Sequence, residues 1–298
     1  MRTAWPFLAA GVLAACSFRP ATGGADAPGT GGDDAGPLAD AAPLGPWGTP
    51  MKVTLDDPTA DDPTLTGDRF ELYVNSSREG NSDIYLSSRT GLDQPWPRPT
   101  RVEALSSGST ETTPEVSADG LTMYFASDRP GGSGSSDLWR SSRLLRTDAW
   151  GTPEPIGELN DATADTAGGV TPDGLAMAFS SFRKANVEWD IYLATRTSTT
   201  TAWQLVTEVA TVNTASYEGS VVLAADQNTL YFDTLRDGGP HQLYAAERGS
   251  NDEFGTPAPI DVLNSTSSDQ DPWVSPDGRY IMFWSDRDGS PGLWESTR

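Results

Sequence analysis

A unit of about 50 residues that recurs five times constrains the fold of this chain more than any other feature. Each copy has an aspartate in a turn, an arginine ten residues later, and a second arginine where the segment ends. The turn aspartates are Asp68, Asp119, Asp173, Asp226 and Asp277. The arginines that follow them are Arg78, Arg129, Arg183, Arg236 and Arg287, and the closing arginines are Arg89, Arg143, Arg196, Arg248 and Arg298. A fixed period of this length predicts a repeat array in which each copy is one supersecondary unit.

Each copy has the pattern of four short strands. After the turn, apolar residues alternate with a period of two, as at Met123 and Phe125, which predicts a strand with one buried face. A hairpin rich in Gly, Asp and Ser follows, and then a second strand, such as the one at Leu138 and Trp139. The spacers open on aromatic residues, where we expect the outermost strands: Trp47, Trp96, Trp150, Trp203 and Phe254. This pattern predicts an all-β propeller with four-stranded blades.

The turn has a physical logic of its own. Ser-Pro-Asp-Gly and its close variants supply a proline that presets φ, an aspartate that bonds back to the backbone, and a glycine in the left-handed position. We therefore assign Asp119, Asp173 and Asp277, with the arginines that follow the turns, to the structure of the repeat. The first and fourth copies have Arg69 and Gln227 in place of the glycine, so we expect altered turns there.

These repeats resemble the Pro-Asp-Gly repeats of TolB-type β-propellers over residues 47–298. The resemblance implies a single propeller domain. TolB propellers have six blades, whereas five copies are present here, so we expect five blades and keep six as the alternative. The last copy ends at Arg298 after its inner hairpin. We expect residues 47–55 to supply its outer strand and close the ring, because closure leaves no open sheet edge.

The N-terminus has the form of a targeting segment. Residues 1–15 are short, mostly apolar and led by Arg2, as in a signal peptide. The sequence Leu-Ala-Ala-Cys that ends at Cys16 resembles a bacterial lipobox, which implies cleavage before Cys16 and lipidation of that residue; an ordinary signal peptide is the alternative. Residues 16–46 are rich in Gly, Ala, Pro and Asp and are expected to form a disordered tether. Ser17, directly after the cysteine, resembles the pattern of outer-membrane sorting. We therefore expect a lipid-anchored protein of the cell envelope, in the outer membrane on its periplasmic or surface face.

Charge and composition exclude several classes of function. The net charge of −22 argues against a nucleic-acid partner, because phosphates require a basic surface. With one cysteine and one histidine (His241, which we expect to be a solvated loop residue), the chain cannot form a Cys/His zinc site or a Cys/His catalytic pair. It also has no nucleophile elbow, phosphate-binding loop or dinucleotide fingerprint.

Acids recur eight residues before the turn aspartates. They are Glu111, Asp165, Glu218 and Asp269; in the first copy Ala60 stands there, and the neighbouring Asp61 is taken as the fifth member. One interpretation is structural, with each acid paired to a repeat arginine so that neighbouring blades are pinned. The other is a ring around the axis that binds a cation or a basic partner. We expect no cofactor; the alternative is calcium, bound there or in the Asp-rich turns 55–63 and 285–290.

Two functions follow from these features. The first is a non-enzymatic binding or scaffold module, since a propeller presents a broad ring of loops to a protein or glycan. The resemblance implies a partner in the envelope or associated with the cell wall, and we expect a monomer. The second is a carbohydrate-active hydrolase or lyase that uses the axial carboxylates.

Overall fold

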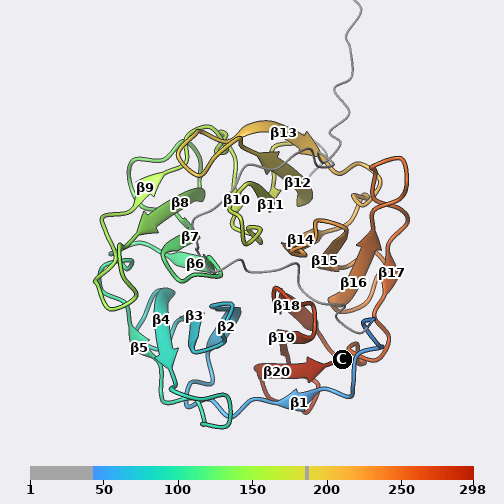
Figure 1. The fold of residues 1–298 in the computed structure, drawn as a ribbon, viewed down its shortest axis with the longest axis horizontal. Helices are drawn as coiled ribbons and strands as arrows, with labels where there is room; N and C mark the ends of the chain where they lie inside the picture. Colours follow the sequence, from blue (N-terminus) through green and yellow to red (C-terminus); the bar gives the residue numbers. More distant parts are fainter. Residues whose placement is uncertain (1–42, 185–187) are drawn as a thin grey trace, which may run out of the picture. The chain divides into compact units, whose positions relative to one another are not determined.

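The computed structural model describes residues 43–184 and 188–298, which form five four-stranded antiparallel sheets around a common axis (Figure 1). The five-bladed β-propeller is therefore confirmed, and the six-bladed alternative is wrong. The signal peptide, Cys16 and most of the tether lie outside the described residues. Within the described residues, no helix is long and apolar enough to cross a membrane.

Four of the blades consist of strands that are consecutive in the chain. Blade 1 contains β2 (Ala60–Leu65), β3 (Glu71–Ser76), β4 (Asp83–Ser88) and β5 (Thr100–Arg101). Blade 2 contains β6 (Glu111–Val116), β7 (Thr122–Ser127), β8 (Asp137–Ser142) and β9 (Glu154–Pro155). Blade 3 contains β10 (Asp165–Thr166), β11 (Ala176–Ser181), β12 (Asp190–Thr195) and β13 (Gln204–Glu208). Blade 4 contains β14 (Glu218–Leu223), β15 (Thr229–Thr234), β16 (Gln242–Glu247) and β17 (Ala258–Pro259).

Blade 5 joins the two ends of the described chain. It contains β18 (Asp269–Val274), β19 (Tyr280–Ser285), β20 (Gly292–Thr297) and β1 (Met51–Lys52). β1 is antiparallel to β20, and the Val53 amide donates to the Leu293 carbonyl at 2.8 Å. The N-terminal strand thus supplies the outer strand of the last blade, as the repeat count predicted.

The turn between the first two strands of a blade has the same form in all five blades. The aspartate accepts a hydrogen bond from the amide two residues later, at 2.9–3.1 Å. The next residue has a positive φ, whether it is glycine, as at Gly174 (φ 69°), or not, as at Arg69 (φ 58°) and Gln227 (φ 60°). The expectation of altered turns in blades 1 and 4 is therefore wrong, because both non-glycine residues adopt the left-handed conformation.

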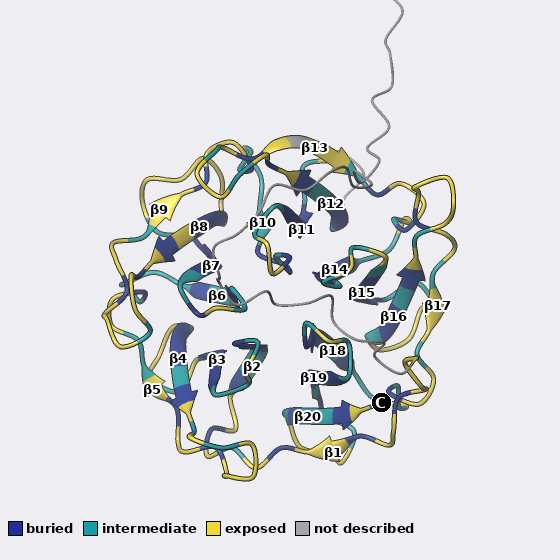
Figure 2. Ribbon diagram, in the orientation of Figure 1, coloured by how far each residue is buried: buried dark blue, intermediate teal, exposed yellow. Residues whose placement is uncertain are grey.

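Hydrophobic cores fill the spaces between adjacent blades, and the inner strands are buried while the outermost are exposed (Figure 2). Each closing arginine covers the aromatic residue that opens a spacer, with the guanidinium 4.0–4.3 Å from the ring centre. Its Nε donates to a carbonyl of the turn described above. These arginines therefore tie the outer strand of each blade to its inner turn.

Candidate functional site

The four recurring acids are completely buried at the start of the innermost strands. Each forms an ion pair with the first arginine of its own blade. The oxygen–nitrogen distances are 2.9 Å for Glu111–Arg129, 2.7 Å for Asp165–Arg183, 3.2 Å for Glu218–Arg236 and 2.5 Å for Asp269–Arg287. A buried carboxylate that is paired in this way is neutralised and held in place.

The same arginines also bind the chain that enters the blade. Each donates through Nη2 to a backbone carbonyl of the connection from the preceding blade. The acceptors are Leu105, Leu159, Val212 and Leu263. The pairs therefore lie within one blade, and what they anchor is the connection between blades. This is the arrangement that the structural interpretation expects, except that the ion pair itself does not cross between blades.

In blade 1 the first arginine, Arg78, has a different acidic partner. Ala60 faces Ser76 as Glu111 faces Ser127, so Ala60 has the register of the recurring acids. Arg78 instead pairs with Asp57, which is buried, at 2.8 Å. Asp61 does not share the register of the recurring acids, because it lies one residue further along β2. It lies instead with the carboxylates near the axis that are described below.

The residues that do face the axis follow the recurring acids by two positions. There the innermost strands of blades 1, 2, 4 and 5 contain a bulge, seen as a shift in register. At the bulge, non-glycine residues have positive φ: Asp62 (47°), Thr113 (44°), Ser220 (45°) and Asp271 (55°). A bulge redirects a side chain out of the regular alternation, and these four residues line a hollow on the axis.

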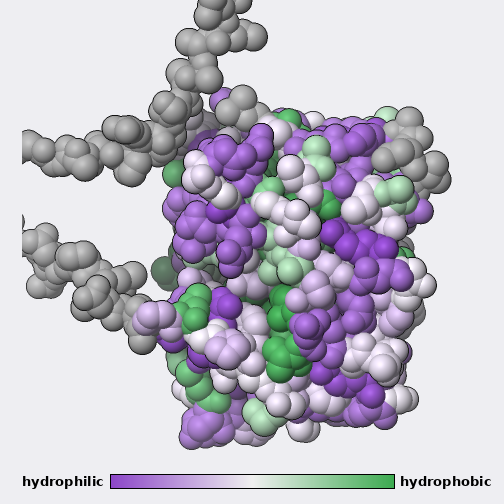
Figure 3. Space-filling model, turned by 90° about the vertical axis from the view of Figure 1, so that its right-hand side faces the viewer, coloured by the Kyte–Doolittle hydropathy of each residue, from purple (hydrophilic) through white to green (hydrophobic). Residues whose placement is uncertain are grey.

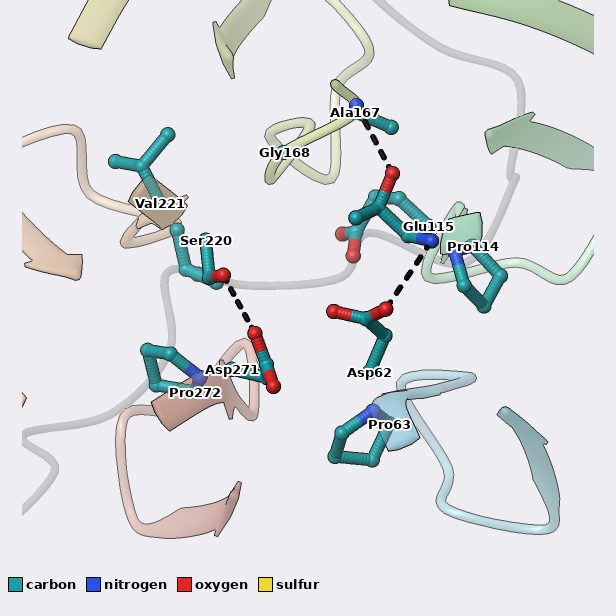
Figure 4. A pocket seen from close by; sticks show the side chains of 12 residues that line it. Asp62, Pro63, Pro114, Glu115, Ala167, Gly168, Ser220, Val221, Asp271 and Pro272 are labelled. Carbon is teal, nitrogen blue, oxygen red and sulfur yellow. Dashed lines mark hydrogen bonds between the residues drawn. The ribbon is translucent and has the colours of Figure 1, made fainter. Parts of the chain in front are cut away.

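The axial hollow is small. Its volume is about 30 Å³, and none of the four recurring acids lines it. Asp62 and Asp271 point toward each other across it, and Ser220 donates to Asp271 at 2.5 Å (Figure 4). By the same measure a water molecule needs roughly 10–15 Å³, so the hollow holds only a few water-sized groups.

Asp61, Asp62 and Asp271 form a cluster of carboxylates, named here the axial cluster. Each offers an oxygen that lies within 4.8 Å of the oxygens offered by the other two. Burial raises the pKa of Asp61 and of Asp62 well above the usual range, and the neighbouring charge of Asp271 raises both further. Among the described residues, no arginine or lysine forms an ion pair with any of the three.

Glu115 borders the axial hollow from β6. Burial raises its pKa to about 8, although the Thr64 hydroxyl donates to Oε2 at 3.1 Å and lowers it somewhat. This carboxyl is therefore protonated at neutral pH.

A histidine–aspartate pair lies beside the cluster. Nδ1 of His241 is 2.5 Å from Oδ2 of Asp233, which is completely buried, and the Tyr217 ring meets the imidazole edge-on at 4.9 Å. Burial lowers the pKa of His241, but its hydrogen bond to Asp233 and the charge of that residue raise it, with a net rise. His241 is half-buried, so the expectation of a solvated loop residue was wrong.

Sequence reasoning missed Asp62, Asp233 and Asp271 as a group. For Asp62 and Asp271 the bulges were the missing information, because strict alternation would point these two residues away from the positions that they occupy. A usable signal existed in the row of small or acidic residues two positions after the recurring acids. The two Asp-rich turns have different partners. In the later one, Oδ2 of Asp288 forms an ion pair with Nζ of Lys52 at 2.8 Å. The earlier one supplies Asp61 and Asp62 of the axial cluster.

The fold and site define a class: a five-bladed β-propeller with carboxylates on its axis. Solved structures of similar fold include a putative TolB from Agrobacterium tumefaciens, with 21% identity, a TM-score of 0.51 and coverage of 76% of this chain and 69% of that one. TolB from Acinetobacter baumannii has 17% identity and a TM-score of 0.51; the match covers 80% of this chain but only 54% of that protein.

Propeller hydrolases are similar to the same degree. A thermostable family-43 glycoside hydrolase has 13% identity and a TM-score of 0.53, with coverage of 80% of this chain and 88% of that one. At these identities the likeness shows the fold alone. No family model matches the chain, and no curated protein matches it.

Proposed function

We propose that this chain is a non-catalytic binding propeller, anchored in the bacterial cell envelope through a lipid on Cys16. The observation that carries the proposal is the small axial hollow of about 30 Å³, which has no room for a sugar ring. The recurring acids support it as well, because arginines already occupy them. A binding function would then use the outer surface of the ring.

The partner that fits this surface is a protein with a basic segment. The net charge is −22, and the face of the molecule that carries β16 and β17 is mostly hydrophilic (Figure 3). A groove of about 250 Å³ lies between the outer strands of blades 3 and 4. Its floor includes Val209 and Phe254, and its rim includes Arg248 and three acids. Of these acids, Glu208 pairs with Lys184 and Asp252 with Arg248, which leaves Glu253 without an ion pair among the described residues. An apolar floor with a free carboxylate at its rim suits a lysine or arginine side chain, whose stem is apolar and whose end is charged.

Capture from the native envelope with matched variants tests this proposal. The lipidated protein is cross-linked in its own envelope, and the captured proteins are compared with those captured by Glu253→Arg. Glu154→Arg, an exposed position on the outer strand of blade 2, is the matched control. We expect Glu253→Arg to lose a captured protein that the wild type and the control retain, and we expect high salt to release it. Equal capture by both variants would overturn the assignment of the groove.

Glycoside hydrolysis is the second candidate function, and the unpaired carboxylates of the axial cluster favour it. Inverting glycosidases hold their two carboxyl groups about 6.5–9.5 Å apart and retaining ones about 5–5.5 Å apart. One oxygen from each carboxylate of the axial cluster lies within 4.8 Å of those offered by the other two, a spacing near the retaining range and below the inverting one. Hydrolysis of nitrophenyl glycosides or of polysaccharides that Asp62→Asn abolishes would replace the binding proposal with this one.

A further inference from the structure

The axial cluster differs from most of the buried acids of this propeller. Seven of them have an arginine partner, namely Asp57, Glu71, Asp83 and the four recurring acids. Asp233 pairs with His241, while Asp137 and Glu115 each stand apart from other carboxylates and accept hydrogen bonds from backbone amides or a hydroxyl. Asp61, Asp62 and Asp271 have hydrogen bonds from backbone amides, a hydroxyl and an amide side chain, but no cationic side chain within ion-pair distance among the described residues. Carboxylates this close together must bind protons or a cation, because their mutual repulsion is not otherwise offset.

Two further oxygens near the cluster have no hydrogen-bond donor. One is Oδ1 of Asp233, a completely buried side chain whose charge raises the pKa of Asp61. The other is Oδ1 of Asn75, which is 7% exposed and whose amide nitrogen already donates to Ser82. Asn75 lies directly opposite Asp61 in the β2–β3 pair, so the two side chains share one face of the blade. Buried acceptors without donors are rare, and a bound cation would satisfy them.

We infer that the axial cluster is a binding site for one divalent cation of the calcium type. Its ligands would be the carboxylates of Asp61, Asp62 and Asp271, and water molecules held by the oxygens of Asn75 and Asp233 would complete the shell. An all-oxygen set rich in carboxylates is what hard cations prefer.

The spacing of the oxygens is compatible with calcium. Calcium binds oxygen at about 2.3–2.6 Å, so ligands on opposite sides of the ion lie up to about 5 Å apart. The oxygens of the axial cluster all lie within 4.8 Å of one another, which is inside that span. Calcium is preferred over magnesium here because it accepts irregular all-oxygen shells, whereas magnesium requires a near-ideal octahedron.

The position of the site gives the cation a structural consequence. Asp61 and Asp62 belong to β2 of the first blade, and Asp271 belongs to β18 of the last blade. These blades meet where the ring closes, and they share a hydrophobic core. A cation between them would strengthen the closure at the inner strands, while β1 closes it at the outer edge.

Titration with calcium chloride tests the inference on the mature chain after treatment with EDTA. We expect calorimetry to show one calcium per chain and calcium to raise the unfolding temperature. Asp62→Asn and Asp271→Asn should each weaken binding at least tenfold. Glu115→Gln is the matched control, since this buried carboxyl borders the same hollow but is not a ligand, and it should change affinity less than twofold.

The sign of the stability change separates a ligand role from a purely structural one. In EDTA the asparagine variants should unfold at the same temperature as the wild type or higher, because they relieve repulsion; in calcium the wild type should be the more stable. Absence of both heat and a temperature shift in the wild type would overturn the inference. So would calcium binding that neither variant weakens, and Asp61→Asn provides a third variant should one of the others fail to fold.

Discussion

At the scale of single residues, the chain uses its charges in two different ways. The recurring acids and arginines neutralise each other and hold the connections between blades. The axial carboxylates are brought together at bulges and, within residues 43–184 and 188–298, have no such partner. Sequence periodicity could predict the first set, because a residue that recurs in every copy usually serves the repeat. It could not predict the second, because a bulge changes the direction of a side chain without changing the repeat.

Gln227 shows the cost of a non-glycine residue in the turn. Its φ of 60° lies in the left-handed region, which costs an L-residue roughly 1 kcal/mol. We expect Gln227→Gly to raise the free energy of unfolding by about 0.5–1 kcal/mol, measured by urea denaturation. Gly278→Ala, at the equivalent turn of blade 5 with φ 68°, should lower it by a similar amount. A lower free energy of unfolding for Gln227→Gly would contradict the claim that the left-handed φ of Gln227 costs stability.

Glu115 should make stability depend on pH. Its pKa is about 8 in the folded protein against 4.5 in the unfolded chain, so the folded state holds the extra proton between these values. Stability should therefore fall as pH rises from about 4.5 to 8, by up to about 4 kcal/mol from this group. Glu115→Gln should remove that fall, since the amide stays neutral. Parallel pH profiles of unfolding for wild type and variant would contradict the assignment.

At the scale of strands and blades, the fold followed from the sequence more completely than the site did. Turn, alternating strand, hairpin and aromatic spacer recur with fixed spacing, so blade number and ring closure could be counted. What counting missed was the uniform geometry of the turns, since Arg69 and Gln227 adopt a conformation that favours glycine. Local hydrogen bonds of the turn aspartates outweigh that preference.

β1 should be the most sensitive strand, because it alone closes the ring from outside the last repeat. A chain that starts at Asp56 leaves β20 with an open edge, so we expect a lower unfolding temperature and self-association. A peptide of residues 44–55 added in trans should restore the unfolding temperature and suppress the self-association. The same peptide with Val53→Pro should not, because it lacks the amide that donates to Leu293. Unchanged melting of the truncated chain would show that β1 does not close the ring.

At the scale of the whole molecule, the residues that maintain the ring differ from those that we propose to bind ligands. The ion pairs and interblade cores maintain the ring, and the acidic exterior and the axial cluster remain for ligands. The similarity to both TolB proteins and propeller hydrolases extends to the fold, so the function rests on the placement of the carboxylates.

One comparison tests this separation most directly: the free energy of unfolding of Glu218→Gln and of Asp271→Asn, by urea denaturation in EDTA. Glu218→Gln leaves the buried Arg236 without its carboxylate, and we predict a loss of about 3–5 kcal/mol. Asp271→Asn removes a carboxylate that is repelled by its neighbours, and we predict no loss or a gain. The opposite ranking, with Asp271→Asn the more damaging, would contradict the division between structural and ligand-binding acids.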